Sequence, residues 1–220
     1  MYNIAQKREV MRAERRPRRK RMKTHAATVI GGEFKGKVIE IPSVSTTRSS
    51  KAILRESLFN TLQFDLVGKP FVEVFAGSGS VALEALSRGA SKAWCIEKNR
   101  EVYEILRDNV ERIAPGRIET VWGDSFEEFH RIYRRLEEMG EKAYFYFDPP
   151  FSIREGMEEI YEQTLGLLEK IRPPHCELAI VEHMTGVDLP ERIGSLSLEK
   201  KRRFGKSTLS YYRPAESDEA

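Results

Sequence analysis

The segment Tyr144-Phe145-Tyr146-Phe147-Asp148-Pro149-Pro150-Phe151 is the part of this 220-residue chain that best indicates its fold. Its four consecutive aromatic residues are typical of a buried strand. The strand must end at the proline pair, because proline has no N–H to donate and restricts the residue before it. The segment predicts a rigid turn presenting a carboxylate, free carbonyls and an aromatic ring. Such groups suit a planar amine such as a nucleobase edge, although an ordinary Asp-Pro turn has the same residues.

Strands and helices alternate on both sides of this segment. A glycine turn, Ala76-Gly77-Ser78-Gly79-Ser80, follows one strand and opens a helix, and Asn99 is placed to cap the next helix. The expected strands are 71–75, 92–96, 118–122, 144–147 and 178–181, and further helices are expected at 125–136 and about 157–171. This order predicts a parallel sheet covered on both faces. Residues 196–203 and 207–212 predict a closing antiparallel hairpin.

The N-terminal part has a different pattern. Residues 28–30 and 36–42 predict a small β-hairpin, and a Ser/Thr-rich loop follows. Either Ser49 or Ser50 is expected to cap a helix on which Leu54, Leu58 and Leu62 repeat every four residues.

The net charge of +3 is unevenly distributed. Residues 1–24 hold ten Lys or Arg and two Glu, so this arm carries +8 and the remaining 196 residues carry −5. A basic arm on an acidic body is typical of a nucleic-acid binder, although a solubilising tail has the same composition. No apolar run reaches the roughly 20 residues of a membrane span, and no signal peptide is visible, so we expect a soluble, cytoplasmic protein. Cys95 and Cys176 have no metal-ligand spacing, so no metal site is expected.

Acidic side chains stand at the ends of four successive predicted strands. They are Glu73, Glu97, Asp124 and Asp148, and Glu97 follows Gly77 by 20 residues, the spacing of an acid that binds a ribose. Each acid alone is compatible with a helix cap or a solvated loop. Together they suit a cationic cofactor with ribose hydroxyls and an adenine amine. S-adenosylmethionine has these three features. Glu182 and His183 end the next strand, where they either line the base pocket or form a solvated or capping pair.

Several motifs in one order carry a resemblance. They are Val72 to Gly79, Leu83 to Ala90, Asp148 to Phe151, Ile30-Gly31-Gly32 with Lys35-Gly36-Lys37, Arg55 to Asn60, and Gly205 with Leu209-Ser210-Tyr211. The chain resembles the RsmD family of bacterial rRNA methyltransferases from about Val29 to Arg213. The resemblance implies S-adenosylmethionine-dependent methylation of N2 of one guanine, guanine 966, in 16S rRNA. Glu73 stands where the family usually has Asp, and Ser49-Ser50-Lys51-Ala52-Ile53 replaces the family's Pro-Thr and Asp-Arg pairs.

The implied fold is a class I, Rossmann-like methyltransferase with a seven-stranded, mostly parallel sheet, a C-terminal antiparallel hairpin and an N-terminal β-hairpin extension. We divide the chain into a basic arm (1–24), the extension (25–65), the methyltransferase domain (66–214) and a tail (215–220). The predicted catalytic residues are Asp148, Pro149, Pro150 and Phe151. The predicted cofactor residues are Glu73, Phe75, Ala76, Gly77, Ser78, Gly79, Glu97, Lys98, Asp124 and Ser125. The predicted RNA contacts are Arg15, Arg16, Arg18, Arg19, Lys20, Arg21, Lys35, Lys37, Arg48 and Arg55.

We expect Asp148 and the Pro149 carbonyl to accept the two amino hydrogens of the base, while Phe151 stacks on its ring. The expected partner is 16S rRNA within an assembling small subunit, bound by a monomer without membrane association. A DNA methyltransferase for adenine or cytosine amines is one alternative, although the short loops leave no room for a target-recognition insert. An RNA-binding module with a degenerate cofactor pocket is the other.

Overall fold

The computed structural model describes residues 22–43, 48–150 and 158–215. In chain order its elements are β1 (Thr24–Thr28), β2 (Val38–Pro42), α2 (Arg48–Leu62), β3 (Phe71–Glu73), α3 (Ser80–Ser87), β4 (Ala93–Glu97), α4 (Arg100–Ile113), β5 (Ile118–Trp122), α5 (Ser125–Met139), β6 (Ala143–Phe147), α6 (Glu158–Leu168), the 3-10 turn η1 (Pro173–His175), β7 (Cys176–Met184), β8 (Arg192–Ile193), β9 (Leu196–Phe204) and β10 (Ser207–Pro214). The alternation of strands and helices therefore agrees with the sequence pattern. No helix in the described ranges has the length and apolar character that crossing a bilayer requires.

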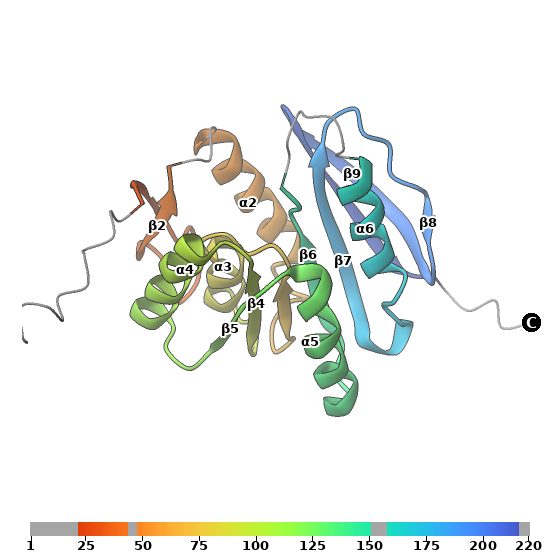
Figure 1. The fold of residues 1–220 in the computed structure, drawn as a ribbon, viewed down its shortest axis with the longest axis horizontal. Coiled ribbons are helices and arrows are strands. Elements are labelled where there is room, and N and C mark those ends of the chain that lie inside the picture. Colours follow the sequence, from red (N-terminus) through yellow and green to blue (C-terminus); the bar gives the residue numbers. More distant parts are fainter. Residues whose placement is uncertain (1–21, 44–47, 151–157, 216–220) are drawn as a thin grey trace, which may run out of the picture.

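One sheet of the described chain has eight strands in the order β5-β4-β3-β6-β7-β10-β9-β8 (Figure 1). The five strands β5, β4, β3, β6 and β7 are parallel to one another, whereas β10, β9 and β8 each run antiparallel to their neighbours. This is the predicted class I, Rossmann-like arrangement with its C-terminal antiparallel hairpin. The expected number of seven strands is wrong, because the sheet of the described residues has eight. The eighth is β8, which pairs with the start of β9 because the chain reverses at Gly194, whose φ is 54°. Two residues are too short to show any periodicity.

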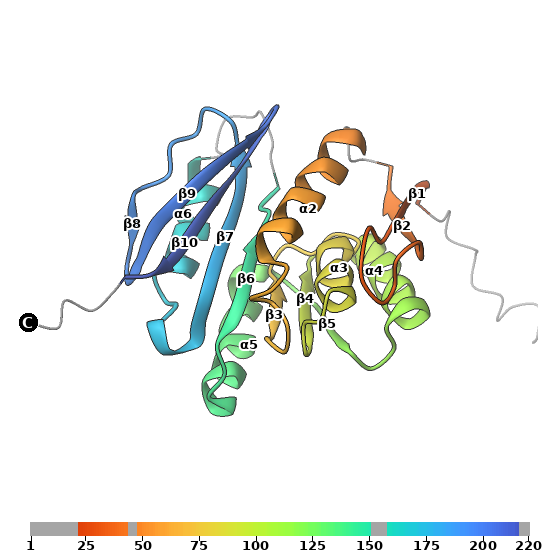
Figure 2. The same cartoon turned by 180° about the vertical axis from the view of Figure 1, so that it is seen from behind.

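Helices cover both faces of this sheet. Helices α2, α3 and α4 pack on one face and α5 and α6 on the other (Figure 2). Side chains of β6 alternate between the two cores, with Tyr144 and Tyr146 on the first face and Phe145 and Phe147 on the second. The aromatic strand is therefore buried on both sides, and the turn after it starts from a rigid base.

The N-terminal hairpin forms a separate two-stranded sheet, in which β1 and β2 are antiparallel. Its predicted first strand, 28–30, is wrong, because β1 ends at Thr28. The backbone N–H groups of Ile30 and Gly31 donate to the carboxylate of Glu84 instead, at 2.7 and 2.9 Å. Helix α2 begins at Arg48, so Ser49 and Ser50 lie in its first turn and not at the predicted cap position.

Candidate functional site

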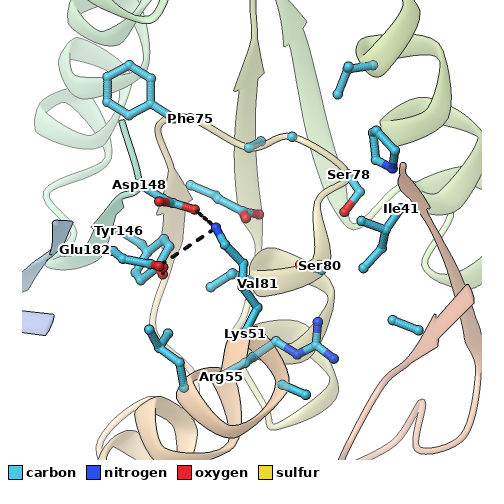
Figure 3. Close-up of a pocket in the computed structure, with 18 of the residues that line it drawn as sticks. Ile41, Lys51, Arg55, Phe75, Ser78, Ser80, Val81, Tyr146, Asp148 and Glu182 are labelled. Carbon is cyan, nitrogen blue, oxygen red and sulfur yellow. Dashed lines mark hydrogen bonds and ion pairs between the residues drawn. The ribbon is translucent and has the colours of Figure 1, made fainter. Parts of the chain in front are cut away.

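A cavity of about 470 Å³ opens at the carboxyl ends of β3, β6 and β7 (Figure 3). Its other walls are the glycine turn after β3, the first half of α2 and the β1–β2 hairpin. Glu73, the turn residues 75–78 and Asp148 line it together. Strands β3 and β6 are neighbours and pair with Glu73 opposite Tyr146, which explains why these groups meet.

The two glycines of the turn have different roles. Both have positive φ, 55° at Gly77 and 75° at Gly79, which other residues adopt at a cost. A Cβ at Gly77 would meet nothing within 4 Å, whereas one at Gly79 would lie 2.4 Å from Leu106 Cδ1. Gly77 thus leaves a cradle open to the cavity, and Gly79 lets α3 pack against α4. Asn109 of α4 fixes the turn by donating to the Ser78 carbonyl at 3.0 Å.

Glu73 is buried at the floor of the cavity. Its Oε2 accepts the backbone N–H of Ala82 at 2.9 Å and lies 3.8 Å from Cys95 Sγ. Burial raises the pKa of Glu73 to about 8, and the charge of Asp148 adds to that, whereas backbone hydrogen bonds from Ala82 and Val81 oppose it. This carboxyl is therefore held largely protonated near neutral pH, and a cation beside it would favour its charged form.

The other predicted cofactor residues lie at the two neighbouring strand ends, outside the wall of this cavity. Glu97 accepts hydrogen bonds from the backbone N–H groups of Gly77 at 2.9 Å and Asn99 at 2.6 Å. Burial raises the pKa of Glu97, although these two hydrogen bonds act to lower it. Asp124 caps α5 through the N–H of Phe126 and pairs with Lys98 Nζ at 2.6 Å. Ser125 is buried and donates to the Val74 carbonyl.

Asp148 directly follows β6, and its carboxylate is half-buried. Its Oδ2 accepts a hydrogen bond from Lys51 Nζ of α2 at 2.6 Å (Figure 3). Pro149 is buried and Pro150 is exposed. The predicted stacking residue, Phe151, lies outside the described residues.

Lys51, Tyr146 and Glu182 lie beside Asp148, and of these three the sequence pattern gives a possible place in the pocket only to Glu182. Glu182 of β7 is buried and lines the cavity, and its Oε2 accepts the Tyr146 hydroxyl at 2.6 Å. Its Oε1 accepts no hydrogen bond from the described residues and lies 3.8 Å from Lys51 Nζ. The expected alternative of a solvated pair is wrong, because His183 is also buried and bonds to Ser210 at 2.8 Å. Successive side chains of a strand point to opposite faces of the sheet. This alternation could have indicated from sequence that Glu182 and His183 do not face the same side.

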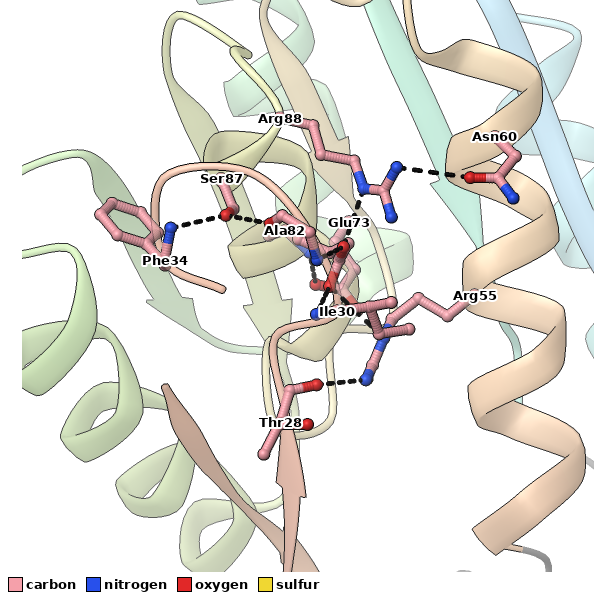
Figure 4. Close-up of polar contacts among 11 residues, drawn as sticks. Thr28, Ile30, Phe34, Arg55, Asn60, Glu73, Ala82, Ser87 and Arg88 are labelled. Carbon is pink, nitrogen blue, oxygen red and sulfur yellow. Dashed lines mark hydrogen bonds and ion pairs between the residues drawn. The ribbon is translucent and has the colours of Figure 1, made fainter. Parts of the chain in front are cut away.

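The β1–β2 hairpin is fixed over the cavity by a polar network on α3 (Figure 4). Glu84 is fully buried and, besides the two backbone N–H groups of the hairpin, accepts Arg88 Nε at 2.8 Å. Ser87 Oγ donates to the Gly31 carbonyl and accepts the N–H of Phe34 at 2.8 Å. A buried carboxylate with this many donors is well satisfied, so the hairpin wall is a built part of the site.

The predicted RNA contacts fall into three groups. Lys35 and Lys37 are exposed in the β1–β2 connection, and Arg48 opens α2. Arg55 is buried in the cavity wall, where it donates to the Thr28 carbonyl at 2.8 Å, and its Nε lies 3.9 Å from Glu84 without a hydrogen bond. The arginines and lysine of the basic arm, Arg15, Arg16, Arg18, Arg19, Lys20 and Arg21, lie outside the described residues.

Comparison with known proteins gives consistent matches over most of the chain. The "Putative rRNA methyltransferase YlbH" of Bacillus subtilis is 27% identical over 187 residues, which cover 84% of this chain and 97% of that protein. Ribosomal RNA small subunit methyltransferase D of Escherichia coli K12 is 34% identical over 142 residues, 64% of this chain and 66% of that protein.

Solved structures match equally broadly. The "Putative methyltransferase yhhF from Escherichia coli" has a TM-score of 0.66 and 29% identity, covering 87% of this chain and 100% of that one. An RNA methyltransferase from Salinibacter ruber in complex with S-adenosyl-L-homocysteine has a TM-score of 0.52 and 14% identity over 80% of this chain and 98% of that one, which shows a shared fold.

A family model described as conserved hypothetical protein 95 matches residues 27–213, which include nearly all of the cavity lining. The match at this extent, with the relatives above, means that the chain belongs to that family, the RsmD family of rRNA methyltransferases.

Proposed function

We propose that this protein transfers a methyl group from S-adenosylmethionine to the exocyclic N2 of a guanine in 16S rRNA, the family's guanine 966. The observation that carries the proposal is the position of Asp148 in one cavity with the open glycine turn and Glu73. Neighbouring strands β3 and β6 bring the two halves of the reaction together, the cofactor cradle on one and the amine acceptors on the other.

The chain's residues fit this cofactor. The open space above Gly77 admits a ligand close to the backbone, and Glu73 suits the ammonium of an amino-acid group because that cation would favour the charged carboxylate. Glu97, at the end of β4, suits the ribose hydroxyls, and Asp124 with Lys98, at the end of β5, suits the adenine. When bound, S-adenosylmethionine would supply the methyl group from its positively charged sulfur, and the broken S–CH3 bond would leave the neutral thioether of S-adenosylhomocysteine.

The amine of guanine is a weak nucleophile, because its lone pair is delocalised into the ring. Asp148 and the Pro149 carbonyl accept its two hydrogens and so turn the lone pair toward the incoming methyl group. The nitrogen gains one N–C bond and gives up one proton, which Asp148 takes and passes to water. The base reaches the cavity by leaving its stack, and Phe151 holds the extruded ring.

The RNA would approach across the hairpin side of the cavity. Lys35 and Lys37 are exposed in the β1–β2 connection, and the basic arm precedes β1 in the sequence, so both segments add positive charge for RNA phosphates. We propose that the protein acts as a monomer on an assembling small subunit, where the target nucleotide is still accessible.

Product identification tests this proposal. The protein is incubated with methyl-labelled S-adenosylmethionine and with protein-free 16S rRNA, isolated small subunits or 23S rRNA, and the RNA is digested to nucleosides for mass spectrometry. We expect N2-methylguanosine from small-subunit RNA and none from 23S rRNA. Methylated adenosine or cytidine, or no labelled nucleoside, would contradict the proposal, and Asp148→Asn serves as the low-activity control at equal reaction time.

A further inference from the structure

The acceptor side of the cavity contains a second carboxylate that orientation of the amine does not require. Glu182 stands at the end of β7, the strand next to β6, and is 1% exposed. One of its oxygens is held by the Tyr146 hydroxyl, while Oε1 has no hydrogen-bond partner among the described residues. A buried carboxylate oxygen without a donor is costly, so such a group in a cavity wall indicates a ligand that supplies the donor.

Lys51 shows where that donor would lie. Its ammonium nitrogen is 2.6 Å from Asp148 Oδ2 and 3.8 Å from Glu182 Oε1, between the two carboxylates (Figure 3). The lysine side chain is 47% exposed, so its flexible stem can move aside. The ammonium thus stands in for N–H groups of a substrate that both carboxylates can grip at once.

The hydrogen-bonding edge of guanine has that pattern. N1–H and the N2 amine are adjacent donors, whereas adenine and cytosine each place a ring-nitrogen acceptor beside their amine. We infer that Glu182 Oε1 accepts the N1–H of the target guanine while Asp148 accepts an N2 hydrogen, which makes Glu182 the residue that selects guanine over other amino-bearing bases. This inference rests on the proposed function and adds to it the source of base specificity.

Charge complementarity supports the same assignment. A carboxylate oxygen repels the lone pair of an adenine or cytosine ring nitrogen, so the site discriminates by an unfavourable contact as well as a favourable one. The Tyr146 hydroxyl acts as a positioning group, because it fixes Oε2 and leaves Oε1 on the side of Lys51, whose Nζ lies 3.8 Å away.

A base analogue tests the inference. In 2,6-diaminopurine the 2-amino group is retained but N1 has no hydrogen. Small-subunit rRNA is prepared by ligation with guanosine or 2,6-diaminopurine riboside at the methylated position, assembled with small-subunit proteins, and assayed for kcat/KM. The wild-type protein should prefer guanine by roughly 100-fold or more, since a site that bonds a substrate N–H rejects analogues that lack it.

The variant Glu182→Gln should reduce that preference to below about 10-fold, because the carboxamide can turn its NH2 toward the ring nitrogen. Tyr146→Phe should reduce it by a few-fold and provides a second variant, and Glu177→Gln at the other end of β7 should leave it unchanged. Binding of S-adenosylhomocysteine, measured by calorimetry, should be the same in all four proteins and confirms that each is folded.

The possible failures are distinguishable. If the wild-type protein makes N2-methylguanosine and both cavity variants keep the wild-type preference, the role of Glu182 is overturned and the proposed function stands. If the wild-type protein makes no N2-methylguanosine in any small-subunit substrate, the proposed function is overturned and the inference with it.

Discussion

The ammonium of Lys51 lies 2.6 Å from the carboxylate of Asp148 and 3.8 Å from that of Glu182. Burial raises the pKa of Glu182, and the charge of Asp148 raises it further, while the charge of Lys51 and the hydrogen bond from the Tyr146 hydroxyl lower it. Removing Lys51 therefore raises the pKa of Glu182, so more of this carboxyl is protonated at a given acidic pH.

The variant Lys51→Met should shift the acidic limb of the pH–rate profile to higher pH. The proposed site needs Glu182 charged, so activity at pH 6 should fall more than activity at pH 8.5. The measurement is kcat/KM for small-subunit methylation between pH 5.5 and 9. Lys69→Met is the matched control, since Lys69 pairs with Glu177 away from the cavity. An acidic limb at the same pH in the variant and the wild type would refute the electrostatic role of Lys51.

Asp148→Asn should lower kcat by about 10²–10³-fold, the usual effect of losing one well-placed group that stabilises a transition state. The amide is nearly the same size as the carboxylate but presents an NH2 that opposes the amine of the base. Affinity for S-adenosylhomocysteine should change by less than a few-fold, because Asp148 lies on the acceptor side. Asp188→Asn, at an exposed position, is the control. A kcat within a few-fold of the wild type would exclude the assigned role.

Glu73 should make stability depend on pH. Its pKa in the folded protein is about 8, whereas a glutamate in an unfolded chain titrates at about 4.3. Between these values the folded chain holds a proton that the unfolded chain has lost, so the free energy of unfolding falls as pH rises through this window. Glu73→Gln removes the effect and should gain about 2–4 kcal/mol relative to wild type between pH 5 and pH 8.5.

Urea unfolding at both pH values measures this gain. The control Glu191→Gln changes an exposed carboxylate and should leave the dependence on pH unaltered. A constant difference between Glu73→Gln and wild type across the window would mean that burial does not shift this carboxyl as stated.

Sequence predicts those parts of the site that are local. The glycine turn, the strand ends and the Asp-Pro-Pro turn are each set by a few consecutive residues, and the structure places Glu73, Gly77 and Asp148 around one cavity. The cap at Asn99 is local in the same way, and its side chain accepts the N–H groups of Glu101 and Val102.

Contacts between distant segments could not be predicted in this way. Lys51 and Glu182 meet only because α2 crosses the ends of β6 and β7, and nothing near either residue in the sequence indicates the other. The sequence places Arg55 among the helix residues that could face an RNA partner. Its burial depends on Glu84, whose own partners come from the β1–β2 hairpin.

Two glycines of that hairpin offer a matched test of how closely it packs on α3. Both have positive φ, 77° at Gly32 and 82° at Gly36, but a Cβ at Gly32 would lie 1.7 Å from the Ser87 carbonyl oxygen while one at Gly36 would meet nothing within 4 Å. Gly36→Ala should cost about 1–2 kcal/mol of unfolding free energy from strain alone. Gly32→Ala should cost about 1–3 kcal/mol more, because backbone atoms cannot move aside easily.

Thermal and urea unfolding compare the two variants, and calorimetry with S-adenosylhomocysteine reports on the cavity. Gly32→Ala should also weaken that binding, since the hairpin is a wall of the cavity, whereas Gly36→Ala should not. Equal losses of stability in both variants would show that the hairpin does not pack on α3 as closely as described.

Deleting residues 1–23 should weaken RNA binding without altering the cavity. The deleted segment carries ten Lys or Arg and two Glu, so its removal leaves fewer phosphates neutralised and fewer counterions released on binding. The slope of log K against log salt concentration should become shallower by roughly 0.7–0.9 for each phosphate that the arm no longer neutralises. Filter binding of small-subunit RNA between 50 and 300 mM salt gives the slope, and S-adenosylhomocysteine affinity, measured in parallel, should be unchanged.

The variant Lys35→Ala/Lys37→Ala should reduce the slope by a smaller amount, because it removes only two charges from the exposed β1–β2 connection. An unchanged slope after the deletion would mean that the arm does not bind RNA phosphates.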